Sequence, residues 1–91
     1  MLIVVSYDLP DDRRRTKLAH NLKDFGVRVQ YSVFECHLTA DELGQLRSRL
    51  QKLIEPEEDQ VRIYLLCAEC TARVEVHGAG SRTEDPEVLV L

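Results

Sequence analysis

The sequence predicts an α+β domain in which two helices pack on one face of a four-stranded sheet. Short runs rich in β-branched residues alternate with two segments of helical periodicity, in the order strand, helix, strand, strand, helix, strand. The 91 residues suffice for one domain, and 44% apolar with 31% charged residues is typical of a folded chain. With 5% aromatic residues and no Trp, the core is expected to be mainly aliphatic.

The first strand and the first helix are separated by a proline. Residues 2–7 form a continuous apolar run, which is typical of a buried strand. Pro10 ends this strand, and Asp11 or Asp12 can cap a helix that starts there. Apolar residues then recur with helical spacing at Leu18, Leu22 and Phe25. A helix is therefore expected over residues 12–25.

Gly26 is expected to cap the end of that helix, and a segment of strand character follows it. Within residues 27–38 the apolar positions alternate, but their phase slips by one residue between Val33 and Phe34. The slip predicts a bulge or sharp bend near Phe34-Glu35. One bent strand and two strands of a hairpin are both compatible with this pattern.

The second helix has a clear start signal. Thr39 and Glu42 have the spacing of a capping box, in which the side chain of each residue accepts a hydrogen bond from the backbone amide of the other. A helical stripe follows at Leu43, Leu46, Leu50 and Leu53. The helix is expected to end near Ile54, before an acidic loop at 55–59 and a last strand at 61–67.

This order of elements matches the split βαβ, or ferredoxin-like, arrangement. We assign residues 1–70 to that domain and residues 71–91 to a C-terminal extension. The extension ends in an apolar segment, 88–91, that is expected to add a strand to a sheet edge of its own chain or of a partner. The sheet face opposite the helices carries Tyr, Val and Ile with no element to cover it, which favours a dimer.

Charge is distributed unevenly along the chain. The net charge is −4, yet residues 1–52 carry +2 and residues 53–91 carry −6. The total argues against a duplex-binding module, whereas the step in charge allows one basic face and one acidic edge. No apolar run approaches the about 18 residues of a membrane span. We therefore expect no membrane association and, since no signal pattern is visible, a cytoplasmic location.

The three cysteines do not indicate a disulfide scaffold. Cys67 and Cys70 have the C-x-x-C spacing of half a metal site or of a redox pair, and no second such pair is present. Cys36 and His77 could complete a metal site with this pair, but their spacing in the sequence is the sole argument for it. We expect all three thiols to be buried or without a role.

Asp8 follows the first strand directly. A carboxylate at the carboxyl end of a central strand is a usual position for metal binding or catalysis, although an aspartate there can also form a turn. Asp11 and Asp12 already serve the helix cap, which leaves Asp8 available. Two copies of Asp8 related by a two-fold axis could hold one Mg²⁺, and such a site suits phosphodiester chemistry. His20 and His37 are expected to be surface or structural residues.

A basic cluster, Arg13 to Lys17, opens the first helix. Cations at a helix N-terminus oppose the helix dipole, whereas a phosphate there is attracted by the dipole and by the arginines. A solvated helical face and a nucleic-acid contact are therefore both open. Arg28 either extends this patch or flanks a core strand.

Four segments resemble the second core CRISPR-associated protein family, small endonucleases that work beside the CRISPR integrase. They are Tyr7-Asp8, Asp11–Leu18, Arg28–Phe34 and Val61–Tyr64, in order within residues 1–66. The string Arg-Val-Gln-Tyr-Ser-Val-Phe is the most specific of them. Residues 67–85 match nothing in the family's pattern.

The resemblance implies a ferredoxin-like homodimer with the two sheets packed face to face, in which the terminal strand of one protomer joins the partner's sheet. It implies that Asp8 is the catalytic and Mg²⁺-binding residue, contributed once by each protomer. It further implies that five residues support activity or contact nucleic acid: Tyr7, Arg15, Lys17, Arg28 and Phe34. Lys17 stands where some members have Arg.

Two functions follow as hypotheses. The first is a Mg²⁺-dependent endonuclease acting on RNA or DNA, with phosphates held by Arg15, Lys17 and Arg28. The second is a non-catalytic dimeric adaptor that bridges the CRISPR integrase and binds incoming duplex DNA during spacer acquisition. A toxin-like ribonuclease of related fold and a metal chaperone using Cys67 and Cys70 are further alternatives.

Overall fold

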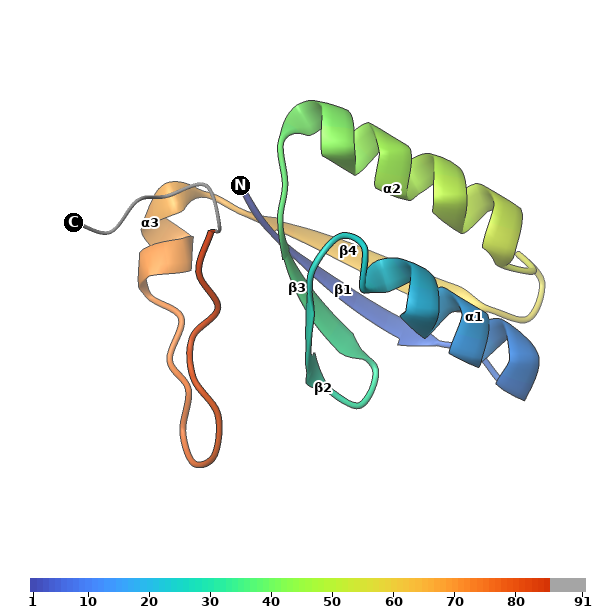
Figure 1. Ribbon diagram of the computed structural model, residues 1–91, viewed down its shortest axis with the longest axis horizontal. Coiled ribbons are helices and arrows are strands. Elements are labelled where there is room, and N and C mark those ends of the chain that lie inside the picture. Colours follow the sequence, from blue (N-terminus) through green and yellow to red (C-terminus); the bar gives the residue numbers. More distant parts are fainter. Residues whose placement is uncertain (86–91) are drawn as a thin grey trace.

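The computed structural model describes residues 1–85, and the predicted strand 88–91 lies outside them. Seven elements follow in order (Figure 1): β1 (Leu2–Asp8), α1 (Asp12–Leu22), β2 (Val27–Gln30), β3 (Val33–His37), α2 (Ala40–Leu53), β4 (Gln60–Leu66) and α3 (Ala68–Ala72). The predicted order is confirmed through β4, and the short α3 was not predicted. Over residues 1–85, no helix has the length and apolar character needed to cross a bilayer.

The sheet has the strand order β2-β3-β1-β4, with every neighbouring pair antiparallel. This is the predicted ferredoxin-like topology, and it places β1 between β3 and β4. The register pairs Leu2 with Leu66 at one end of β1 and Asp8 with Gln60 at the other. The residue that follows β1 is therefore close to the loop that precedes β4.

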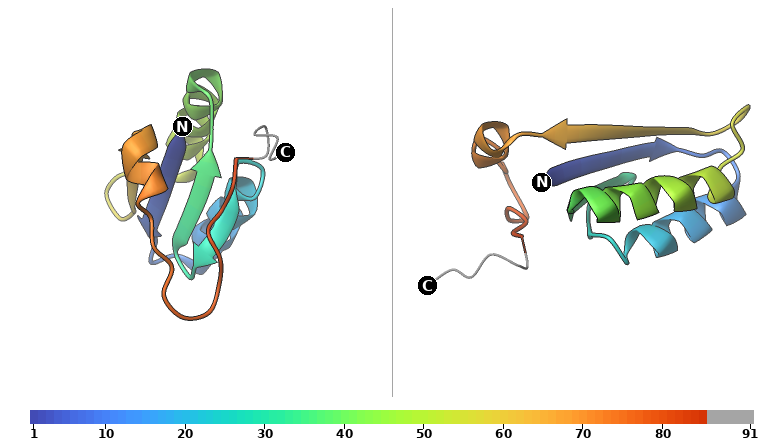
Figure 2. Two further views of the ribbon diagram at one scale, coloured as in Figure 1. Left: turned by 90° about the vertical axis from the view of Figure 1, so that its left-hand side faces the viewer. Right: turned by 90° about the horizontal axis from the view of Figure 1, so that it is seen from above.

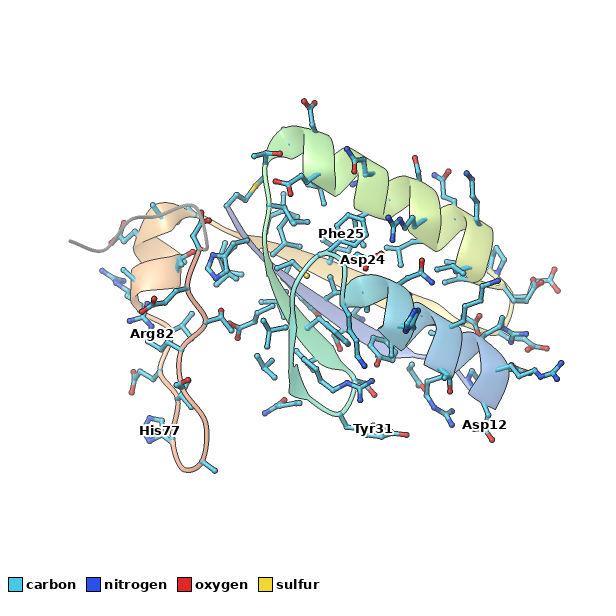
Figure 3. All side chains as sticks on the ribbon, in the orientation of Figure 1. Asp12, Asp24, Phe25, Tyr31, His77 and Arg82 are labelled. Carbon is cyan, nitrogen blue, oxygen red and sulfur yellow. The ribbon has the colours of Figure 1, made fainter. Side chains whose placement is uncertain are left out.

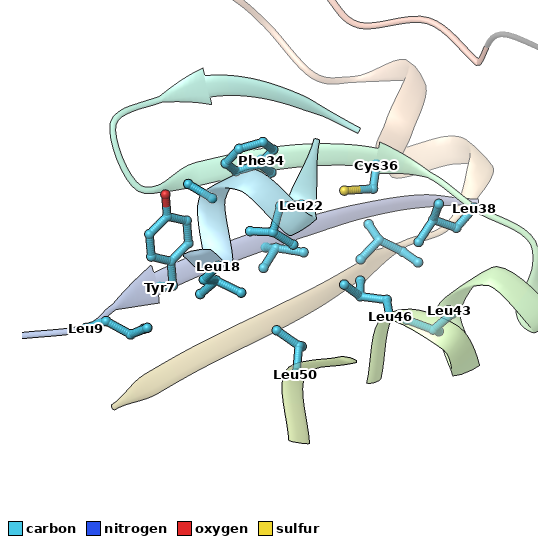
Figure 4. Packing of buried hydrophobic residues seen from close by; sticks show 13 residues of the cluster. Tyr7, Leu9, Leu18, Leu22, Phe34, Cys36, Leu38, Leu43, Leu46 and Leu50 are labelled. Atoms are coloured by element: carbon cyan, nitrogen blue, oxygen red, sulfur yellow. The ribbon is translucent and has the colours of Figure 1, made fainter. Parts of the chain in front are cut away.

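Both long helices cover the same face of the sheet, as the view from above shows (Figure 2). Alternation along β1 turns Ile3, Val5 and Tyr7 toward the helices, where they are buried. The core between the two layers is mainly aliphatic, as predicted (Figure 4); it includes Leu9, Leu18, Leu22, Phe34, Cys36, Leu38, Leu43, Leu46 and Leu50.

Within residues 1–85, no helix covers the opposite face of the sheet (Figure 2). The same alternation assigns Val4, Ser6 and Asp8 to this open face, and Tyr64 lies opposite Val4 on β4 with 48% of its surface exposed. Ile63 lies instead on the covered face and packs against the core. The predicted apolar surface is therefore limited to a patch around Val4 and Tyr64, without an isoleucine from β4, since the register places Glu35 and Arg62 on the same face.

Two predicted positions were wrong, the end of the first helix and the site of the bulge. Helix α1 ends at Leu22 with Lys23 as its C-cap, and Phe25 lies in the following turn. Its side chain still packs against the core from that turn, which is why Phe25 falls at a helical spacing from Leu18 and Leu22 in the sequence. The bulge lies between Arg28 and Gln30 and not at Phe34-Glu35, since residues 27–37 form two hairpin strands. The phase slip therefore marks the turn between two strands, of which β2 is exposed along its whole length and β3 buries Phe34 and Cys36.

Gly26 has a different role from the predicted helix cap. A Cβ atom at this position would collide with the carbonyl oxygen of Glu35 and lie 2.8 Å from the Cα of Cys36, both on β3. Only a residue without a side chain lets the turn after α1 pass this close to the sheet. Gly44 in α2 is the opposite case, since a Cβ there has no neighbour within 4 Å.

These two glycines give a matched test of packing. Gly26→Ala is expected to lower the free energy of unfolding by about 1 to 3 kcal/mol, because the backbone must shift to admit the methyl group. Gly44→Ala is expected to raise it by about 0.5 to 1 kcal/mol, because alanine is the better helix former. Urea denaturation followed by circular dichroism measures both changes. Equal effects of the two substitutions would contradict the close approach at Gly26.

Candidate functional site

Asp8 is the last residue of the central strand β1 and is exposed. Its backbone pairs with Gln60 of β4, so the sheet fixes this strand end beside the start of β4. Within residues 1–85, no side chain or backbone group forms a hydrogen bond or ion pair with the Asp8 carboxylate, and Asp11 provides the α1 cap by accepting from the Arg14 amide. Asp8 is therefore available for a ligand, as the sequence predicts.

Arg15 fixes the loop that follows Asp8. Its Nη1 donates to the carbonyl oxygen of Leu9 at 3.0 Å, and its Nη2 donates to the Asp12 carboxylate. The hydrogen bond to Asp12 raises the pKa of Arg15, which keeps its positive charge. Because Leu9 is buried, this side chain holds the loop between β1 and α1 against the core.

Arg14 is part of the basic cluster in the sequence, but acidic residues neutralise it in the structure. Its Nε donates to Asp59 at 2.8 Å and its Nη2 donates to Glu58 at 2.7 Å. These hydrogen bonds raise the pKa of Arg14, and the bond from Arg14 lowers the pKa of Asp59. The strand topology could have predicted this contact, because the antiparallel pairing of β1 with β4 places the loop before β4 beside the residues after β1.

Lys17 has a different environment. It is exposed on α1, and within the described residues no side-chain hydrogen bond or ion pair involves its ammonium group. It lines a shallow depression together with Asp12, Arg13, Thr16 and His20. His20 is thus a surface residue, as predicted. The cations of α1 therefore have three environments. Arg15 positions the loop after β1, Arg14 is paired with the acidic loop before β4, and Lys17 lies on the outer surface.

Tyr7, Arg28 and Phe34 form one cluster at the β2–β3 hairpin. The Tyr7 hydroxyl donates to the carbonyl oxygen of Tyr31 and accepts from Arg28 Nη2, each at 3.4 Å. The Arg28 guanidinium lies 5.5 Å from the centre of the Phe34 ring, at cation–π distance. Phe34 is fully buried, so any support it gives to activity acts through this packing.

The structure does not bring all predicted site residues to one point. Asp8 and Tyr7 alternate along β1, so their side chains point to opposite faces of the sheet. The hairpin cluster is nonetheless at the same end of the fold, since the Tyr7 hydroxyl reaches Tyr31 at the hairpin turn, and Tyr31 and Asp12 lie toward that end in Figure 3. Sequence reasoning missed Tyr31, which is 74% exposed at the tip of this hairpin.

The three thiols, predicted to be buried or without a role, lie in two different environments. Cys36 is buried, whereas Cys67 and Cys70 are exposed around the start of α3, because β4 ends before them. His37 bonds to Thr83 at 3.0 Å, which is a structural contact, and His77 lies on the loop at the other end of the molecule (Figure 3). Residues 1–85 contain no cluster of three or more His, Cys, Asp or Glu side chains placed to bind a metal.

Comparison with known proteins places this geometry in a family. A family model described as "CRISPR associated protein Cas2" matches residues 1–74. A relative from Synechocystis, named CRISPR-associated endoribonuclease Cas2 3, is 42% identical over 99% of this chain and 98% of its own.

Two solved structures have the same fold. Streptococcus pyogenes Cas2, in crystals at pH 6.5, matches with a TM-score of 0.75 and 36% identity, covering 86% of this chain and 100% of the other. A chain of a partial Cas6-RT-Cas1–Cas2 complex matches with a TM-score of 0.72 and 30% identity, covering 82% and 88%. The match over most of the chain, with Asp8 and the hairpin cluster inside it, shows that this chain belongs to the Cas2 family of CRISPR-associated proteins.

Proposed function

We propose that this chain is a Mg²⁺-dependent endonuclease that hydrolyses phosphodiester bonds, acting as a homodimer in the cytoplasm. The observation that carries the proposal is the exposed Asp8 carboxylate, unpartnered within residues 1–85, at the end of the central strand. The relative named as an endoribonuclease makes single-stranded RNA the first substrate to test, with duplex DNA beside it.

The ligand set of one chain fits Mg²⁺ only in part. Mg²⁺ prefers oxygen ligands, keeps several waters, and is commonly bound by one or two carboxylates. One described chain offers a single available carboxylate at this strand end, Asp8, and a second copy of Asp8 from a partner completes the pair. Two like charges near one axis repel each other, so a divalent cation between them favours their approach.

The open sheet face supports the dimer that this site needs. Asp8 lies on that face together with Val4 and Ser6, and Val4 is beside the half-exposed Tyr64. Packing two such faces against each other buries the apolar patch and brings the ends of the two β1 strands toward a common axis. The proposed dimer and the proposed metal site therefore depend on the same surface.

Each supporting residue has a distinct proposed role. Bound Mg²⁺ would stabilise charge on the phosphoryl oxygens as a Lewis acid. Arg15 positions the loop after Asp8 through Leu9 and retains N–H groups that can donate to a phosphate. Lys17 and Arg28 are exposed cations suited to the phosphates of a bound strand. Tyr7 and Phe34 hold the Arg28 side chain in place, Tyr7 through a hydrogen bond and Phe34 through a cation–π contact.

A second function is favoured by one specific observation. A structure of similar fold was solved within a partial Cas6-RT-Cas1–Cas2 complex. We therefore propose as the alternative a dimeric adaptor that bridges the CRISPR integrase and binds incoming duplex DNA without cutting it. In that function Lys17 and Arg28 retain their phosphate contacts, while Asp8 is not needed for chemistry.

Replacement of Asp8 separates the two functions. Asp8→Asn is expected to abolish Mg²⁺-dependent cleavage of labelled single-stranded RNA and duplex DNA, while dimerisation and nucleic-acid binding persist. The reason is that the amide has the same shape but lacks the charge that attracts the cation. Asp11→Asn is the matched control, because asparagine caps a helix as well as aspartate does. A wild-type protein that binds duplex DNA but cuts neither substrate would favour the adaptor.

Salt dependence tests the proposed phosphate contacts. Lys17→Gln is expected to weaken binding of single-stranded RNA and to reduce the slope of log K against log salt by about 0.7 for each phosphate that the ammonium group neutralises. Fluorescence anisotropy at several KCl concentrations, with EDTA to prevent cleavage, measures this slope. Lys52→Gln, near the end of α2, makes the same charge change away from the proposed phosphate-binding residues. Equal slopes for the two variants would refute a specific role for Lys17.

A further inference from the structure

Cys67 and Cys70 lie where β4 ends and α3 begins, and both are exposed free thiols. The sheet register pairs Leu66, the last residue of β4, with Leu2 at the start of β1. The cysteines are therefore at the opposite end of β1 from Asp8. A role for this pair is independent of the function proposed above.

The backbone holds the two cysteines across one turn. Cys67 is the N-cap of α3, and its Sγ accepts a hydrogen bond from the Cys70 amide at 3.4 Å. The Thr71 amide donates to the Cys67 carbonyl oxygen at 2.8 Å and closes the same turn. Residues three apart in a helical turn are neighbours, and a disulfide accepts Cα separations of about 4.4 to 6.8 Å. Side-chain rotation is therefore enough to join the two sulfurs.

The two thiols are not equivalent. Hydrogen bonds from the Cys70 amide and the Cys70 thiol lower the pKa of Cys67. The pKa of Cys70 is raised, because its thiol donates to the Cys67 sulfur and so retains its proton. At neutral pH Cys67 is thus the better nucleophile, and Cys70 is placed beside it to complete a second step.

Cys36 provides an internal contrast. It is fully buried in the core, where desolvation raises the pKa of its thiol to about 11. A thiol that is both inaccessible and protonated does not take part in exchange reactions. Reactivity of the native chain is therefore confined to the exposed pair.

The ligand set at this place does not favour a metal. A structural zinc site needs four ligands, and the pair supplies two. His77, which could have added a third, has its Nε2 3.0 Å from the Glu75 carboxylate on the loop after α3. Within residues 1–85, no third His, Cys, Asp or Glu side chain joins the two thiols in a metal-binding group.

We propose that Cys67 and Cys70 are a redox-active dithiol that exchanges with small-molecule disulfides such as oxidised glutathione. The Cys67 thiolate attacks one glutathione sulfur, which breaks the glutathione disulfide, forms a mixed disulfide and releases one glutathione thiolate. Cys70 then loses its proton to solvent, and its thiolate attacks the Cys67 sulfur and expels the second glutathione. The protein dithiol loses two electrons, and one small disulfide becomes two thiols.

The position of the pair gives this exchange a structural context. Carbonyl oxygens at the end of α3 accept hydrogen bonds from Arg82, at 2.8 Å for Thr71 and 3.3 Å for Ala72. Thr83 then donates to Glu35 on β3 at 2.6 Å. Helix α3 therefore joins the sheet to the segment that leads toward the C-terminus (Figure 1). A crosslink across its first turn acts at this junction.

The test is thiol mapping of the folded, full-length chain. The protein is equilibrated with defined ratios of reduced to oxidised glutathione in the presence of EDTA, quenched with acid, unfolded, alkylated and mapped by mass spectrometry. We expect a reversible Cys67–Cys70 disulfide within one chain, seen as the loss of two of the three alkylatable thiols. Dithiothreitol is expected to restore both.

Three variants assign the steps. Cys36→Ser is expected to form the Cys67–Cys70 disulfide at the same glutathione ratios as the wild type. Cys70→Ser is expected to stop at a glutathione adduct on Cys67, and Cys67→Ser to react far more slowly while keeping the fold, since serine is a good N-cap. Three free thiols under conditions that oxidise the peptide Cys-Ala-Glu-Cys would overturn the proposal. Disulfides that form only between chains, or that involve Cys36 in the native protein, would also overturn it.

Discussion

The antiparallel pairing of β1 with both β3 and β4 is the constraint on which the rest of the structure depends. It sets Asp8 at an open strand end and places Gln60, and with it the acidic loop before β4, beside the start of α1. The same register fixes Leu66 and therefore Cys67 at the far end. One pattern of backbone hydrogen bonds thus decides which side chains can meet, although those side chains are far apart in the sequence.

Electrostatics at the start of α1 follows from this placement. Three consecutive arginines look equivalent in the sequence, but Arg14 is held by Asp59 and Glu58, and Arg15 by Leu9 and Asp12. A guanidinium that already donates to carboxylates gains less from a phosphate than a solvated cation does, because part of its donor set is occupied. The number of basic residues therefore overstates the basic surface, and the outward-facing side chains, Lys17 among them, are the ones left for the proposed nucleic-acid contact.

The fold could be predicted from local signals, whereas much of the site could not. The capping box at Thr39 and the leucine stripe of α2 are encoded within a few residues, and both are present as predicted. The contact of Gly26 with β3 and the partners of Arg14 arise between segments far apart in the chain, which hydrophobic periodicity does not report. Asp8 was predictable because strand order alone places it, and the Tyr7–Arg28–Phe34 cluster required the resemblance to a family.

The two ends of the central strand present different side chains for a physical reason. At the Asp8 end, the carboxylate lies on one face of the sheet and the Tyr7–Arg28 contact on the other, so charged groups are open to solvent around this strand end. At the other end the sheet runs into a five-residue helix, too short to be stable without its contacts, so its N-cap sulfur and the Arg82 hydrogen bonds hold it in place. We therefore expect the proposed thiol exchange to act on that short helix, since Asp8 lies at the other end of β1.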